Sequence, residues 1–87
     1  MRTKDKLIER FKKQPKDFSW DEIVRIFKMY GFEIDNRGKT SGSRIRFKKY
    51  SERIELHKPH PSSIVKEHVM KQALGFLIEK GYLNIKN

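Results

Sequence analysis

The sequence predicts an α+β fold in which helices cover one face of a three-stranded antiparallel sheet. Apolar residues recur at helical spacing near both ends of the chain, and three short segments between them alternate between apolar and polar residues. Because such alternation is typical of a sheet with one covered face and one open face, two helices are expected to pack on the covered face. The 87 residues suffice for one small domain spanning 1–87.

The first helix is predicted near the N-terminus. A charged segment over about residues 3–14 contains three apolar side chains at helical spacing, namely Leu7, Ile8 and Phe11. Pro15 would end this helix, because the residue before a proline is disfavoured in the helical conformation. We interpret residues 1–17 as an N-terminal helical extension of the domain.

A second helix is predicted to begin after Ser19. Ser19 and Glu22 form a capping-box pattern, in which each side chain bonds the other residue's backbone N–H group. The helix would bury one apolar stripe, formed by Ile23, Ile26, Phe27 and Tyr30. Gly31 stands where a left-handed residue commonly ends a helix.

Alternating segments at residues 32–35, 44–48 and 53–57 predict the sheet. A two-residue turn at 50–51 would give chemically sensible pairs, apolar with apolar and basic with acidic. It would place Phe47 opposite Ile54, Ile45 opposite Leu56, Lys49 opposite Glu52, Arg46 opposite Glu55 and Arg44 opposite His57. A longer loop with the same register is the alternative, since the turn residues are not of the usual Asn-Gly type.

The last helix is predicted over about residues 64–80, with Ser62 or Ser63 as its cap. Its buried stripe would consist of Val65, Val69, Ala73, Phe76 and Leu77, and Gly81 would end it before a short tail that packs back on the domain. Apart from the first helix, the α-β-β-β-α order is that of double-stranded-RNA-binding domains.

The composition of the chain restricts the classes of partner that we expect it to bind. The formal net charge of +10 favours a polyanion, because neutralising phosphates releases their counterions; the alternative is a merely soluble, charged surface. The chain has no cysteine and no apolar run long enough to span a membrane. We therefore expect a cytoplasmic protein with no membrane partner. We also expect no small-molecule cofactor, because so short a chain has little room for an internal cavity. We also expect no metal, since His57 and His60 would give only two of the four ligands that zinc needs.

Cationic groups and imidazoles converge on the second and third predicted strands, which suits phosphate chemistry. Metal-free RNA cleavage needs a base for the 2′-hydroxyl, an acid for the leaving oxygen and cations for the phosphorane. We assign acid–base function to His57 and His60, and phosphate binding to Arg44, Arg46, Lys58, Lys66, Arg37 and Lys39. The alternatives are that His57 is an ordinary exposed strand residue and that His60 packs within its loop.

Other candidates have competing interpretations. The glycine-containing segment 37–42 could cradle a phosphate or be no more than a basic loop. His68 precedes the buried stripe of the last helix and is interpreted as a helix-surface residue. Tyr50, at the hairpin tip, is the aromatic residue best placed to stack on a base.

Residues 20–83 resemble the HicA toxins of bacterial type II toxin–antitoxin systems. The resemblance is carried by an ordered set of features, namely a helix ending in Tyr30-Gly31-Phe32, Gly42-Ser43 entering a strand, Pro59-His60, and a helix beginning near Lys66. It implies a fold like that of double-stranded-RNA-binding domains, cleavage of mRNA, and a HicB antitoxin that binds the toxin and masks its site.

The chain departs from this family at one functional position. The family's functional histidine follows Gly-Ser directly, and Arg44 stands there in this sequence. No catalytic histidine can therefore be assigned to position 44 by resemblance. Either the chemistry uses other groups, or the chain binds RNA without cutting it.

Overall fold

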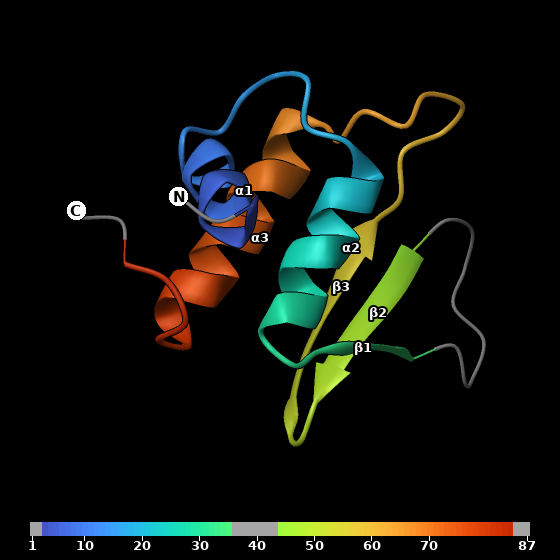
Figure 1. Ribbon diagram of the computed structural model, residues 1–87. Coiled ribbons are helices and arrows are strands. Elements are labelled where there is room, and N and C mark those ends of the chain that lie inside the picture. The colour runs from blue at the N-terminus through green and yellow to red at the C-terminus, as the bar shows by residue number, and fades with distance from the viewer. Residues whose placement is uncertain (1–2, 36–43, 85–87) are drawn as a thin grey trace.

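The computed structural model describes residues 3–35 and 44–84 and confirms the α+β class (Figure 1). The elements follow in the order α1 (Thr3–Lys12), α2 (Trp20–Met29), β1 (Glu33–Asp35), β2 (Arg44–Lys49), β3 (Glu52–His57) and α3 (Glu67–Glu79). The three strands form an antiparallel sheet in the order β1-β2-β3. Figure 1 shows the helices gathered beside one face of this sheet.

The predicted hairpin register is confirmed. Arg44 pairs with His57, Arg46 with Glu55, and Lys49 with Glu52, so the turn consists of Tyr50 and Ser51 alone. Tyr50 adopts a positive φ of 51°, which supplies the left-handed backbone that so tight a turn requires.

Both predicted ends of α2 are also confirmed. The backbone N–H of Glu22 donates to Oγ of Ser19 at 3.2 Å, and the N–H of Ser19 donates to Oε1 of Glu22 at 2.9 Å. At the other end Gly31 has φ +92°, and the N–H of Phe32 donates to the carbonyl of Phe27 at 3.0 Å. This is the Schellman arrangement that a C-terminal glycine favours.

The predicted start of α3 is wrong. The helix begins at Glu67, and neither Ser62 nor Ser63 caps it. The backbone around Ile64 pairs instead with the segment before α2, which keeps it out of the helix. The N–H of Trp20 donates to the carbonyl of Ser63 at 2.8 Å, and the N–H of Val65 donates to the carbonyl of Phe18 at 2.8 Å.

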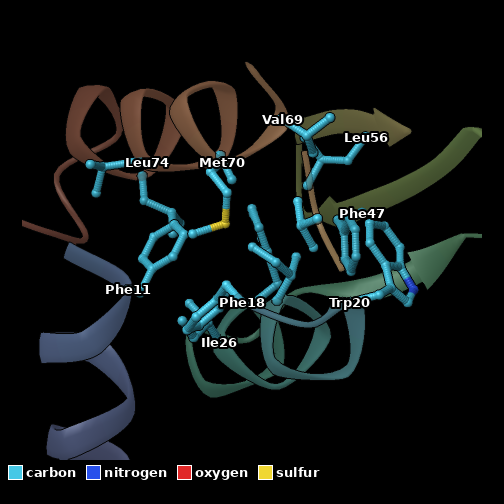
Figure 2. Close-up of a cluster of buried hydrophobic side chains, with 14 of the residues drawn as sticks. Phe11, Phe18, Trp20, Ile26, Phe47, Leu56, Val69, Met70 and Leu74 are labelled. Carbon is cyan, nitrogen blue, oxygen red and sulfur yellow. The ribbon is translucent and has the colours of Figure 1, made fainter. Parts of the chain in front are cut away.

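One apolar cluster joins all the helices to the covered face of the sheet (Figure 2). Phe27 stacks on Phe47 with ring centroids 4.6 Å apart, and Trp20 lies 5.8 Å from Phe47. The predicted stripe of α3 is buried except at Phe76, which is half-buried. Helix α1, which ends earlier than expected at Lys12, contributes Leu7 and Phe11. In the described part of the chain, no helix has the length and apolar character needed to cross a bilayer.

Candidate nucleic-acid interface

An open pocket of about 730 Å³ lies where β2 and β3 meet the start of α3. Its lining is mostly polar and consists of Arg44, Arg46, Arg53, Ile54, Glu55, His57, Lys66, His68 and Gln72. We call this site the basic pocket, because among the described residues four cationic side chains line it against a single carboxylate. Such a surface suits an anionic ligand.

The strands position one half of the basic pocket. Since side chains alternate along a strand, residues 44, 46, 55 and 57 all project from the face opposite the apolar cluster. Arg44 and His57 are direct cross-strand partners at the end of the hairpin away from Tyr50. The guanidinium side chain of Arg44 is 54% exposed and is therefore accessible to a ligand.

Helix α3 supplies the other half. Lys66 is its N-terminal cap residue and makes no side-chain capping hydrogen bond, while His68 lies in its first turn. The helix is held along the outer edge of β3, where Nε2 of Gln72 donates to the carbonyl of Glu55 at 3.2 Å. This contact brings Lys66 and His68 to the same pocket as His57.

Glu55 lies between the two arginines of β2. Its Oε2 accepts hydrogen bonds from Nε and Nη2 of Arg46 at 3.1 and 2.8 Å, and its Oε1 lies 3.7 Å from Nη1 of Arg44. A second carboxylate, that of Asp35, has Oδ2 3.9 Å from Nη1 of Arg46. The hydrogen bond from Arg46, together with the charges of both guanidinium groups, holds the pKa of the Glu55 carboxyl below its ordinary value.

The basic pocket contains four of the eight residues assigned from the sequence, namely His57, Arg44, Arg46 and Lys66. Lys58 and His60 are exposed in the segment after β3, and neither belongs to the lining. Arg37 and Lys39 lie outside the described residues, as does the whole 37–42 segment. Tyr50 remains 89% exposed at the opposite end of the hairpin.

Four polar residues of the pocket were not assigned from the sequence, namely Arg53, Glu55, His68 and Gln72. Arg53 and Glu55 alternate in phase with His57 along β3, so the strand period was a signal that could have identified them. His68 gave no such signal, because its position depends on how α3 packs against β3. Among residues 3–35 and 44–84, no three side chains of His, Asp or Glu are grouped so that they could hold a metal ion.

Comparison with known families identifies most of this chain. The family model described as HicA toxin of bacterial toxin–antitoxin matches residues 20–75, which include α2, the sheet and most of α3. Helix α1 precedes the matched region. A search of curated proteins and a search of solved structures gave no match. Because the family model covers more than half of the sequence, the chain belongs to the HicA toxin family of toxin–antitoxin systems.

Proposed function

We propose that this protein binds mRNA at the basic pocket and cleaves it, and that a HicB-type antitoxin neutralises it. One observation carries the proposal: four cationic side chains and two imidazoles line the same open pocket. A phosphate group would find guanidinium and ammonium partners there, and a ribose 2′-hydroxyl would lie near groups that can exchange protons.

The reaction that suits this set is attack of the 2′-oxygen on the adjacent phosphorus. A base removes the 2′-hydroxyl proton, the P–O5′ bond breaks, and an acid protonates the leaving 5′-oxygen. His57 is the first imidazole for these roles. For the second group, His60 is the assignment made from sequence, and His68 is the imidazole that shares the pocket lining. Arg44 would stabilise the charge that develops on the phosphorane.

Arg44 stands where the family has its functional histidine, but the structure places another histidine beside it. Arg44 and His57 are direct cross-strand partners, and opposing side chains on one face of a sheet have Cβ atoms about 5 Å apart. An imidazole at position 57 is therefore only one cross-strand step from the place where the family has its functional histidine. This proximity supports a shared site in which the histidine comes from β3 instead of β2.

The proposed antitoxin would cover the basic pocket. Membership of a toxin–antitoxin family supports a protein partner in general, and the formal net charge of +10 favours an acidic one. A HicB-type protein that places carboxylates over Arg44 and Lys66 would exclude RNA from the pocket.

Cleavage of a defined RNA by the purified protein, in a buffer containing a metal chelator, tests this function. We expect the wild-type protein to cut the RNA, and His57→Ala to abolish cutting while the thermal unfolding midpoint is unchanged. The chain has three histidines, so His60→Ala and His68→Ala serve as matched variants that identify the second imidazole. Undiminished cleavage by His57→Ala would refute the assignment of this residue.

A second candidate function is RNA binding without cleavage. It is favoured by Arg44 at the family's histidine position and by the ion pairs that join both arginines to Glu55. In that case the RNA stays intact, its binding weakens with salt, and Arg44→Ala reduces the affinity. The same RNA, followed by a gel and by a binding assay, separates the two functions.

A further inference from the structure

The carboxylate of Glu55 lies between two guanidinium groups of the basic pocket, where it occupies donors that an anionic ligand could use. Each of its oxygens faces a different guanidinium, Oε2 that of Arg46 and Oε1 that of Arg44. We propose that Glu55 is an internal competitor of phosphate, which holds the two arginines in place and weakens RNA binding until a phosphate displaces it from Arg44. This inference rests on the proposed RNA-binding function and concerns the regulation of the same site.

Glu55 binds the two arginines unequally. Arg46 donates two hydrogen bonds at 3.1 and 2.8 Å, and its side chain is only 28% exposed. Arg44 is closer to solvent, and its 3.7 Å separation from Oε1 is too long for a good hydrogen bond. A phosphate would therefore bind Arg44 first, while Arg46 stays paired with Glu55.

The two arginines consequently have different roles. Arg44 is the phosphate contact, because its ion pair with Glu55 is the weaker of the two and its guanidinium is accessible. Arg46 is a positioning residue, which fixes the Glu55 carboxylate from the opposite strand. A phosphate can replace a carboxylate on Arg44 because a guanidinium presents the same fork of N–H donors to either anion.

The expected size of the effect follows from Coulomb's law. Glu55 is 34% exposed, so water screens its charge, and two unit charges about 4 Å apart in water interact strongly enough to change a binding constant about fivefold. Removing the carboxylate charge should therefore tighten phosphate binding about fivefold. It should also steepen the salt dependence of binding, because Arg44 is then free to neutralise a phosphate.

The test measures binding of a labelled single-stranded 2′-O-methyl RNA, which has no free 2′-hydroxyl and cannot be cleaved by 2′-oxygen attack. We expect Glu55→Gln to bind about fivefold more tightly than the wild type. We expect this gain to vanish when Arg44→Ala is added. Glu52→Gln is the matched control, since Glu52 lies on the same strand and carries the same charge but does not line the pocket.

Equal gains from Glu55→Gln and Glu52→Gln would overturn the inference, because net charge alone would then explain them. Persistence of the Glu55→Gln gain in Arg44→Ala would overturn it as well. Glu55→Asp, which keeps the charge on a shorter side chain, is a second variant in case the glutamine variant is poorly folded. Glu55→Asp is expected to bind RNA more tightly than the wild type, but by less than Glu55→Gln. If Glu55→Asp tightened binding equally in the wild-type and Arg44→Ala backgrounds, the inference would be contradicted.

Tripolyphosphate separates this inference from the proposed function. Its binding is measured by the rise in the thermal unfolding midpoint. In one outcome no variant binds RNA, but tripolyphosphate stabilises Glu55→Gln more than the wild type, and Arg44→Ala removes the difference. RNA binding is then refuted and the role of Glu55 is supported. If the wild type binds RNA and Glu55→Gln binds it no better, the role of Glu55 is refuted while RNA binding stands.

Discussion

Two glycines that end helices differ in what a methyl group would contact. Gly31 and Gly81 follow α2 and α3 with nearly the same left-handed backbone, φ +92° and +86°. A Cβ atom at position 31 would lie 3.2 Å from Cε of Lys49, whereas a Cβ at position 81 would have no neighbour within 4 Å. Alanine substitution at both sites therefore separates the backbone penalty from the cost of displacing Lys49.

The backbone penalty is common to both substitutions. A left-handed conformation destabilises a non-glycine residue by about 1–2 kcal/mol. Alanine also reduces the entropy of the unfolded chain, which stabilises the folded protein by about 0.4–1 kcal/mol. We therefore expect Gly81→Ala to lower the free energy of unfolding by roughly 1 kcal/mol.

Gly31→Ala carries an additional cost, because it displaces the Lys49 side chain. Nζ of Lys49 donates to the carbonyl of Tyr30 at 2.7 Å and lies 4.5 Å from the ring centroid of Tyr82. Lys49 must shift by a few tenths of an ångström, which weakens the hydrogen bond and the cation–π contact and should cost about 0.5–1 kcal/mol more. The total for Gly31→Ala is therefore roughly 1.5–2 kcal/mol.

Urea unfolding followed by the fluorescence of Trp20 measures both losses, since Trp20 is the single tryptophan and is buried. In a Lys49→Ala background the difference between the two glycine variants should disappear, because the side chain that the methyl group meets is gone. Equal losses for Gly31→Ala and Gly81→Ala with Lys49 present would refute the reasoning. So would a difference that persists in Lys49→Ala.

Further predictions concern the helix cap, the ion pair and the core. Ser19→Ala should lower the free energy of unfolding by about 1 kcal/mol in the same urea assay, whereas Ser63→Ala should have little effect because its contact uses the backbone carbonyl. The pKa of Glu55 is lowered, so its pairing with Arg46 stabilises the fold above the ordinary glutamate range and is lost as the pH falls through the lowered pKa. The difference in unfolding free energy between the wild type and Glu55→Gln should therefore shrink in acid, and a constant difference across a pH series would contradict this. Phe47→Ala should cost about 3–5 kcal/mol, because Phe47 is fully buried and stacks on another ring, and a loss near that of a surface substitution would show that the core rearranges.

The parts of the fold that depend on neighbouring residues could be predicted from the sequence. The hairpin register followed from side-chain pairs such as Arg46 with Glu55, because a shift by one residue would have moved every apolar side chain to the open face. The cap of α2 followed from Ser19 and Glu22, whose mutual hydrogen bonds span a single helical turn.

The start of α3 could not be predicted in this way. Ser62 and Ser63 are good capping residues, but the neighbouring backbone pairs with residues 18–20, which are distant in sequence. That pairing keeps the backbone around Ile64 out of the helix and delays the helix to Glu67. Local propensity was overridden by a tertiary contact that no sequence pattern signals.

The same distinction applies to the basic pocket. Its strand half, with Arg44 and His57 as partners, depends on a period of two and a tight turn, both of which can be read along the chain. Its helical half depends on the direction in which α3 crosses the edge of β3, which the contact between Gln72 and the backbone of Glu55 helps to set. His68 is exposed, as its position just before the buried stripe indicated, but only the packing of α3 against β3 makes it part of the pocket lining. A site built from two elements can therefore be predicted from the sequence only when matching side chains show how the two elements pair. This is the case for β2 and β3, whose side chains match across the hairpin.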